Sequence, residues 1–218
     1  MKTLYLIRHG RTLFNHLYRM QGISDTPLLP EGERKALELG QAFKQKQISF
    51  DAAFSSDLGR ARKTAQLILA NSSRPSLTLT ELEDLREVSF GAFEGNPSAA
   101  TWEKVREVSG IPGLRSDSPD NIRVKALAAI QKIDPTGLAE SYEAVQKRVH
   151  RALTQIFSAH GQTIMAVSHG LYINCLLLTL LGAEKTLAIL PNTSVTKINY
   201  DEEAQHYQVV YIGRESDF

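Results

Sequence analysis

The run Leu4-Tyr5-Leu6-Ile7, followed directly by Arg8-His9-Gly10, is the stretch of sequence that decides the fold. Its first four residues are apolar strand formers, and the polar residues after them end the strand. In open α/β sheets, ligands bind outside the carboxyl ends of the strands. Gly10 allows a sharp turn and the close approach of a ligand. The pattern therefore predicts a buried strand that carries Arg8 and His9 to a ligand-binding edge.

The composition is that of an ordinary globular protein. Of the 218 residues, 42% are hydrophobic and 22% charged, and the formal net charge is +1. This length fits one domain with an inserted cap, and the balanced charge gives no basic face for nucleic acid. Cys175, the single cysteine, excludes an internal disulfide. The apolar stretch 173–181 is too short to cross a bilayer, and the first strand leaves no room for a signal peptide. We expect a reduced, cytoplasmic protein without membrane or nucleic-acid partners.

Alternating strand and helix patterns predict a three-layer α/β/α fold with a mostly parallel sheet of roughly six strands. Expected strands lie at residues 4–7, 50–54, 77–79, 163–167, 194–200 and 207–212, and the last two form a hairpin. Ser55-Ser56-Asp57 is expected to cap a helix that runs through Ile68, and Ser141 a helix that runs through Phe157. Residues 96–136 are less regular, with helical patterns at 102–108 and 122–133. This segment is expected to form a small helical cap over the site.

Four junctions that follow predicted strands carry chemically suitable side chains. His9 and His169 each precede a glycine at the end of a strand, and Arg60 and Glu87 lie on two further junctions. The carboxyl ends of parallel strands meet at one edge of a sheet, so these groups are expected to lie together. A third pair, His160-Gly161, precedes a strand and indicates only the end of a helix.

These residue types suit attack on a phosphate monoester. Arg8 and Arg60 can neutralise its two negative charges through bidentate contacts. A neutral imidazole is a nucleophile that forms a phosphoenzyme and so divides one difficult step into two. Glu87, with a pKa raised toward neutrality, can protonate the leaving oxygen and then deprotonate water.

The chain resembles the histidine phosphatase superfamily, which includes cofactor-dependent phosphoglycerate mutases and broad-specificity phosphatases. Five ordered blocks carry the resemblance and cover nearly everything except residues 96–136. The blocks are Leu6-Ile7-Arg8-His9-Gly10 with Thr12 and Asn15; Gln21-Gly22 with Asp25, Pro27-Leu28 and Gly32; Ser55-Ser56 with Leu58, Arg60-Ala61 and Thr64-Ala65; Leu85, Glu87, Phe90-Gly91 and Glu94-Gly95 followed by Glu140-Ser141; and Val167-Ser168-His169-Gly170.

The resemblance implies a role for each matching position in a single domain of residues 1–218. His9 would be the phosphorylated nucleophile and Glu87 the proton donor. The phosphate pocket and the contacts with substrate would come from Arg8, Arg60, His169, Asn15, Gln21, Gly22 and the backbone of Gly170. The resemblance implies no metal and no cofactor.

Two departures from the family pattern bear on the activity. Arg11 replaces a common Glu or Gln, so it either adds positive charge at the pocket mouth or points to solvent. Residues 96–136 lack the adjacent arginine pair with which the mutases hold a carboxylate and a second phosphate. Arg106, Arg115 and Arg123 are scattered along this segment instead. This favours a metal-independent phosphomonoester hydrolase that acts on small phosphorylated metabolites.

Two alternatives remain at this point. One is a 2,3-bisphosphoglycerate-dependent phosphoglycerate mutase, which uses the same histidine. The other is a non-catalytic module that binds a phosphorylated ligand, although such a module needs no acid at Glu87. The sequence does not identify the substrate among sugar phosphates, phosphoglycerates, nucleotides and phosphoproteins, and it is compatible with a homodimer.

Overall fold

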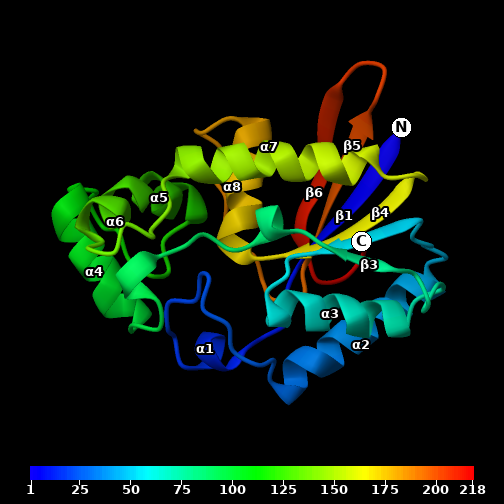
Figure 1. Cartoon of the computed structure of the whole chain (residues 1–218), viewed down its shortest axis with the longest axis horizontal. Helices are drawn as coiled ribbons and strands as arrows, with labels where there is room; N and C mark the ends of the chain where they lie inside the picture. Colours follow the sequence, from blue (N-terminus) through cyan, green and yellow to red (C-terminus); the bar gives the residue numbers. More distant parts are fainter.

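One mixed sheet organises the computed structural model, which describes residues 1–218 (Figure 1). The strand order is β3-β2-β4-β1-β5-β6. Strands β1 to β4 are mutually parallel, and β5 and β6 run antiparallel to their neighbours. Their bounds are β1 (Lys2–Arg8), β2 (Ala52–Ser55), β3 (Leu79–Glu81), β4 (Thr163–Ser168), β5 (Val195–Asp201) and β6 (His206–Arg214).

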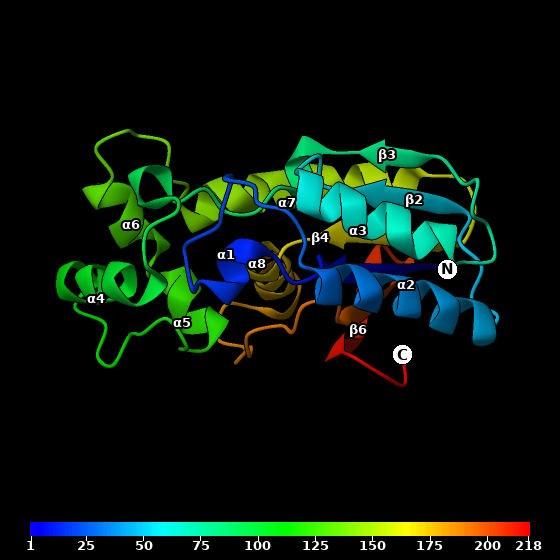
Figure 2. The same cartoon turned by 90° about the horizontal axis from the view of Figure 1, so that it is seen from below.

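Helices cover both faces of this sheet (Figures 1 and 2). Helices α2 (Pro30–Gln45) and α3 (Gly59–Ala70) pack on one face, and α7 (Tyr142–Ser158) and α8 (Gly170–Leu181) pack on the other. Successive residues of β1 enter the two cores alternately, Leu4 on the α7 side and Tyr5 on the α2 side. Because both faces are covered, β1 is apolar at every central position. The predicted three-layer α/β/α fold is confirmed.

Residues 96–136 form three helices beyond one end of the sheet (Figure 1). These are α4 (Ser98–Ser109), α5 (Asp120–Lys125) and α6 (Leu127–Ile133), called here the α4–α6 segment. At its far end, the carboxylate of Asp134 accepts hydrogen bonds from the backbone N–H groups of Ala92, Leu138 and Ala139. Near its middle, fully buried Asp120 accepts from the amide of Asn174 on α8. The segment is therefore fixed to the main body at two points.

Three short elements complete the chain. They are α1 (Leu13–His16) and two single 3-10 turns, η1 (Glu83–Leu85) and η2 (Gly91–Phe93). No helix is both long enough and apolar enough to cross a membrane.

Three local predictions were wrong. The third strand begins at Leu79 rather than Leu77, because the N–H of Leu77 bonds to the carbonyl of Arg74 in a turn. The expected helix at 122–133 is two helices that meet at Ala126. Ser55-Ser56-Asp57 does not cap α3, whose N-cap is Leu58 without a side-chain bond.

The residues of that expected cap have other partners. The Ser56 hydroxyl accepts from the N–H of Leu58, and Asp57 forms an ion pair with Arg86. The first turn of α3 is instead satisfied from a distant loop, because Asp25 accepts from the N–H of Arg60. The Ser141 cap of α7 is confirmed by its bond from the N–H of Ala144.

Candidate active site

His9 lies just beyond the end of β1 and is almost fully buried. Its Nδ1 is 2.7 Å from the carbonyl oxygen of Gly10, which only accepts, so Nδ1 carries the proton. Nε2 is therefore unprotonated, and the Nε of Arg60 donates to it at 3.3 Å. Burial, together with the charges of Arg60 and Arg8, holds the pKa of His9 well below its ordinary value. The ring is thus a neutral imidazole with its lone pair on Nε2.

His169 and Arg8 bring further donors beside this ring. His169 follows β4 directly, and its ring centroid lies 5.1 Å from that of His9. Both ring nitrogens of His169 and the Nε of Arg8 are buried without a protein partner. A Cβ atom on Gly170 would lie 3.1 Å from the Nε of Arg8, so this glycine lets α8 begin against the guanidinium. Unpaired buried donors are costly unless a ligand satisfies them, and the guanidinium of Arg8 together with the N–H of His169 suits an anion.

Arg60 reaches His9 from the first turn of α3 and is fully buried along its side chain. Its Nη1 donates to the carbonyl of Ser24 and to Asp25, and its Nη2 donates to the carbonyl of Gly22. These bonds occupy the outer edge of the guanidinium. The expected bidentate contact of Arg60 with phosphate is therefore not available through both Nη groups, and only Nε faces His9.

The carboxylate of Glu87 lies against the N-terminus of α8, where the helix favours a negative charge. Its carboxylate accepts from the backbone N–H groups of Leu171 at 3.1 Å, Tyr172 at 2.7 Å and Val88 at 3.0 Å. Burial raises the pKa of Glu87, and this effect outweighs the bonds from these N–H groups and the charge of Arg60, which lower it. A carboxyl group with a raised pKa on the wall of the site can act as an acid.

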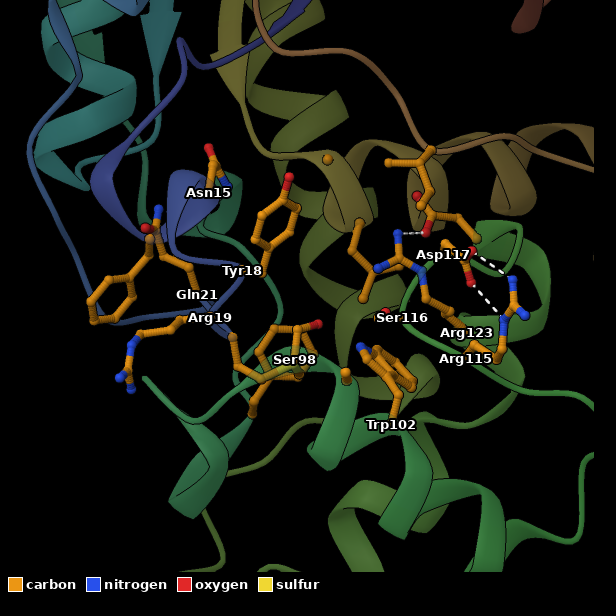
Figure 3. A pocket seen from close by; sticks show the side chains of 18 of the residues that line it. Asn15, Tyr18, Arg19, Gln21, Ser98, Trp102, Arg115, Ser116, Asp117 and Arg123 are labelled. Atoms are coloured by element: carbon orange, nitrogen blue, oxygen red, sulfur yellow. Dashed lines mark hydrogen bonds and ion pairs between the residues drawn. The ribbon is translucent and has the colours of Figure 1, made fainter.

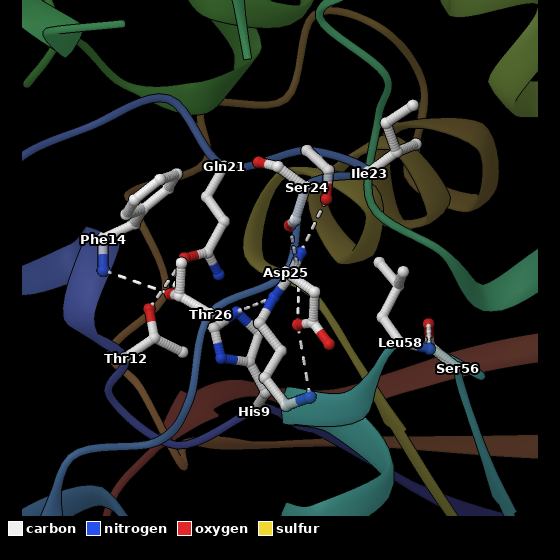
Figure 4. A network of polar contacts seen from close by, with 12 residues as sticks. His9, Thr12, Phe14, Gln21, Ile23, Ser24, Asp25, Thr26, Ser56 and Leu58 are labelled. Atoms are coloured by element: carbon white, nitrogen blue, oxygen red, sulfur yellow. Dashed lines mark hydrogen bonds and ion pairs between the residues drawn. The ribbon is translucent and has the colours of Figure 1, made fainter. Parts of the chain in front are cut away.

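Two side-chain amides are oriented with their nitrogens free, and Figure 4 shows that of Gln21. The Oε1 of Gln21 accepts from the hydroxyls of Thr12 and Thr26, and its Nε2 is buried without a partner. The Oδ1 of Asn15 accepts from the N–H of Thr12 and from the amide of Asn192. Since both amide oxygens are occupied, both nitrogens are left to donate to a ligand.

Gly22 occupies a different place from the one expected of a substrate contact. Its N–H donates to Glu94 at 2.9 Å, and its carbonyl accepts from Arg60 at 2.7 Å. A Cβ atom at this position would lie 2.2 Å from the carbonyl oxygen of Val88. With both polar groups occupied, Gly22 holds the loop and Arg60 in place rather than presenting a donor to substrate.

A cavity of about 770 Å³ opens between these groups and the α4–α6 segment (Figure 3). Arg8, Glu87 and Gly170 line it together with Asn15 and Gln21, whereas His9, Arg60 and His169 are almost fully buried and are not among the lining residues. The outer wall is partly apolar, with Phe14, Tyr18, Phe90, Trp102, Leu114 and Ile189. A cavity of this size and lining is typical of a site for a small organic molecule.

Four arginines around the cavity are paired with acids, whereas Arg19, which also lines it, donates to the carbonyl oxygen of Gly95. Arg11 lines the cavity, and its Nη1 lies 2.6 Å from Glu31. The three arginines of the α4–α6 segment face the same cavity and form the pairs Arg106–Glu103, Arg115–Asp117 and Arg123–Asp120. The positive charge of these four arginines is thus offset locally.

Two residues that the sequence patterns do not single out hold the backbone of the nucleophile. The amide of Asn192 donates to the carbonyl of His9 at 3.0 Å, and the N–H of Thr193 donates to the carbonyl of Arg8 at 3.0 Å. Thr193 has a φ of 65°, an uncommon conformation for a β-branched residue. The only sequence feature at these two residues is the turn before β5. This turn reaches His9 because β5 pairs with β1.

The fold and the site define an α/β enzyme with a neutral histidine and a carboxyl group beside a phosphate-sized cluster of free donors. Comparison with known proteins agrees with this class. The family model described as "Histidine phosphatase superfamily (branch 1)" matches residues 4–212. The chain therefore belongs to the histidine phosphatase superfamily, whose members are phosphatases and mutases that share a phosphohistidine mechanism.

Some of the proteins that resemble this chain are named mutases and others are named phosphatases. Probable phosphoglycerate mutase GpmB of Yersinia pestis (strain Pestoides F) is 34% identical, over 93% of this chain and 86% of its own length. The crystal structure of phosphoglycerate mutase from Bacillus anthracis str. Sterne matches with a TM-score of 0.87 and 34% identity, over 98% of this chain and 93% of that one. Phosphoserine phosphatase from Entamoeba histolytica, in complex with 3-phosphoglyceric acid, matches with a TM-score of 0.70 and 28% identity, over 98% of each chain.

The free amide of Gln21 leads to a prediction about anion binding. Gln21→Met keeps the length of the side chain but removes the Nε2 donor. We expect the dissociation constant of inorganic phosphate to rise about tenfold, because the loss of one hydrogen bond to a charged group weakens binding by roughly this factor. The matched control is Gln41→Met, which changes an exposed residue of α2. An unchanged dissociation constant of phosphate in the Gln21 variant would show that this amide does not face the anion.

Proposed function

We propose that the protein is a metal-independent phosphomonoesterase that hydrolyses small phosphorylated metabolites through phospho-His9. The observation that carries this proposal is the unprotonated Nε2 of His9, placed beside free buried donors and a carboxyl group of raised pKa. A module that only binds a phosphorylated ligand has no use for a buried carboxyl group such as Glu87 on the wall of its anion site. Catalysis therefore explains the site better than binding alone.

In the first step, the lone pair on Nε2 of His9 attacks phosphorus in line with the ester oxygen. The P–N bond forms as the P–O bond breaks, and Glu87 gives its proton to the departing oxygen. The phosphoryl group is held by Nε of Arg8, the ring of His169 and the amide nitrogens of Asn15 and Gln21. Nε of Arg60 leaves Nε2 of His9 and donates to a phosphate oxygen instead.

In the second step, water replaces the histidine. Glu87, now a carboxylate, takes a proton from the attacking water as oxygen binds phosphorus and the P–N bond breaks. The electron pair of that bond returns to Nε2, so His9 is again neutral and inorganic phosphate is released. The low pKa of His9 supports this cycle because the free ring does not retain a proton that would block the next attack.

The charge around the cavity favours hydrolysis over a mutase reaction. A mutase must hold a substrate with a second acidic group while a phosphoryl group is transferred between two of its oxygens. In this chain the three arginines of the α4–α6 segment are each paired with an acid, so that segment supplies little unbalanced positive charge for that group, and Arg19, which also lines the cavity, donates to the carbonyl of Gly95. The apolar outer wall also suits a less charged leaving group. We propose that this segment is the cap that selects the substrate.

A 2,3-bisphosphoglycerate-dependent phosphoglycerate mutase is the second candidate, favoured by the names of the curated relatives and of the Bacillus anthracis structure. Both candidates require the same phosphohistidine. They differ in the acceptor that removes the phosphoryl group, which is water in one and a substrate hydroxyl in the other. A cytoplasmic location and a homodimer stay predictions.

A comparison of two reactions separates the candidates. The purified protein is assayed with 3-phosphoglycerate, with and without 2,3-bisphosphoglycerate, and separately with a panel of phosphomonoesters including p-nitrophenyl phosphate. We expect phosphate release from several esters and no stimulation by the bisphosphate, because water is the acceptor. Isomerisation of 3-phosphoglycerate that is primed by the bisphosphate and much faster than phosphate release would establish the mutase instead.

The role of Glu87 predicts a dependence on the leaving group. Glu87→Gln removes the proton but keeps the shape of the side chain. We expect kcat/KM to fall about a hundredfold or more for alkyl phosphates, which need an acid, and less than about fivefold for p-nitrophenyl phosphate. The wild-type rate on alkyl phosphates should also fall as the pH rises through the raised pKa of Glu87, since the acid form is then lost. Equal losses on both kinds of ester would exclude Glu87 as the acid.

A further inference from the structure

Arg148 of α7 lies beneath the segment that carries Glu87 and uses all of its donors there. Its Nε and Nη2 donate to the two carboxylate oxygens of Glu140 at 2.8 and 2.9 Å. Its Nη1 donates to the backbone carbonyls of Asp84 and Arg86 at 3.0 and 2.9 Å, and its Nη2 donates to the carbonyl of Glu87 at 3.3 Å. One guanidinium therefore fixes three carbonyls of the four-residue stretch that ends at the proposed acid.

Glu140, the partner of Arg148, bonds to the backbone on the C-terminal side of Glu87. Its Oε2 accepts from the N–H of Ser89 at 3.0 Å, and its own N–H donates to the carbonyl of Ser89 at 3.0 Å. The bidentate pair of Arg148 with Glu140 thus holds the backbone both before and after Glu87. The Arg148 side chain is only 13% exposed, so this pair is largely shielded from competing water.

The same guanidinium also contacts the turn of α8 that receives the carboxylate of Glu87. Its central carbon lies 5.0 Å from the centre of the Tyr172 ring, a cation–π distance. The N–H of Tyr172 donates to Oε1 of Glu87 at 2.7 Å. Arg148 therefore contacts both the backbone segment that carries Glu87 and Tyr172, whose N–H binds the Glu87 carboxylate, but it does not line the cavity.

We propose that Arg148 is a positioning residue for proton transfer, which sets the place of the Glu87 carboxyl group without touching substrate. This inference rests on the proposed role of Glu87 as the acid. The planar guanidinium is essential to it, because five donors in one plane reach three carbonyls and a carboxylate at once. A misplaced Glu87 impairs the proton transfer of each step, but kcat/KM reports the first step, in which only a poor leaving group needs its proton. The phosphate site made by Arg8, His9 and His169 has its own supports.

The experiment compares Arg148→Met with Arg151→Met. Arg151 lies three residues further along α7 and pairs with the side chain of Asp84, but it is 57% exposed and bonds to no carbonyl of the segment. The control therefore removes a positive charge and an anchor of the same segment while leaving the backbone near Glu87 held. For each variant, kcat/KM is measured on an alkyl phosphate and on p-nitrophenyl phosphate, together with inhibition by orthovanadate.

For Arg148→Met we expect kcat/KM on the alkyl phosphate to fall about thirtyfold. This loss is smaller than that of Glu87→Gln because the acid is displaced but still present. The kcat/KM on p-nitrophenyl phosphate should fall less than about threefold, and the inhibition constant of orthovanadate should stay within about twofold. Arg151→Met should leave all three unchanged. Equal losses on the two esters, or no loss on the alkyl phosphate, would overturn the proposal.

Two further variants keep the test decisive. Arg148→Lys retains the charge but not the planar donors, so it should show the same selective loss; recovery of the alkyl rate would contradict a role for the guanidinium geometry. Glu140→Gln is the variant to use if Arg148→Met does not fold. It should show a smaller loss of kcat/KM on the alkyl phosphate, and no selective loss would again overturn the proposal.

Coupling to Glu87 distinguishes this inference from the function on which it rests. In a Glu87→Gln background, Arg148→Met should cause no further selective loss, because the proton is already absent. If Glu87→Gln itself shows no leaving-group dependence, the proposed acid is wrong. If Glu87→Gln is selective but Arg148→Met is not, only the positioning role of Arg148 fails.

Discussion

The bond between Nδ1 of His9 and the carbonyl oxygen of Gly10 is the contact on which the chemistry of this site depends. It assigns the proton to Nδ1 and leaves the lone pair on Nε2, while burial and two neighbouring guanidiniums keep the ring neutral. The surrounding structure maintains this arrangement. The turn before β5 holds the carbonyls of Arg8 and His9, and α3 brings Arg60 against Nε2.

A second feature of the site is that contacts within the protein orient its donors. Hydroxyls of Thr12 and Thr26 occupy the oxygen of Gln21, so its nitrogen is the end left for an anion. Glu94 likewise holds the loop that supplies carbonyls to Arg60. The donors are thus in place before substrate arrives, which is the condition for strong electrostatic stabilisation of a transferring phosphoryl group.

Much of the fold and the core of the site could be predicted from the sequence, because both follow from local patterns. Apolar strands that end in His9 and His169 place these residues at one sheet edge in any parallel arrangement. What could not be predicted depends on contacts between distant segments. Asp25 replaces the expected cap of α3, Gly22 faces Glu94 and Arg60 rather than the cavity, and Asn192 reaches His9 only because β5 pairs with β1. Of the arginine pairs in the α4–α6 segment, Arg106–Glu103 and Arg123–Asp120 join residues three apart within one helix, whereas Arg115–Asp117 lies in a loop; that all three face one cavity depends on how the segment packs.

The most direct test of this account is to identify the residue that carries the phosphoryl group during turnover. The wild-type protein is mixed with a phosphomonoester, quenched rapidly under alkaline conditions that preserve a P–N bond, and mapped by mass spectrometry. The account predicts phosphorylation on His9 alone, and its absence in a folded His9→Ala variant that still binds inorganic phosphate. A phosphoryl group on another residue, or substantial turnover by the His9→Ala variant, would contradict it.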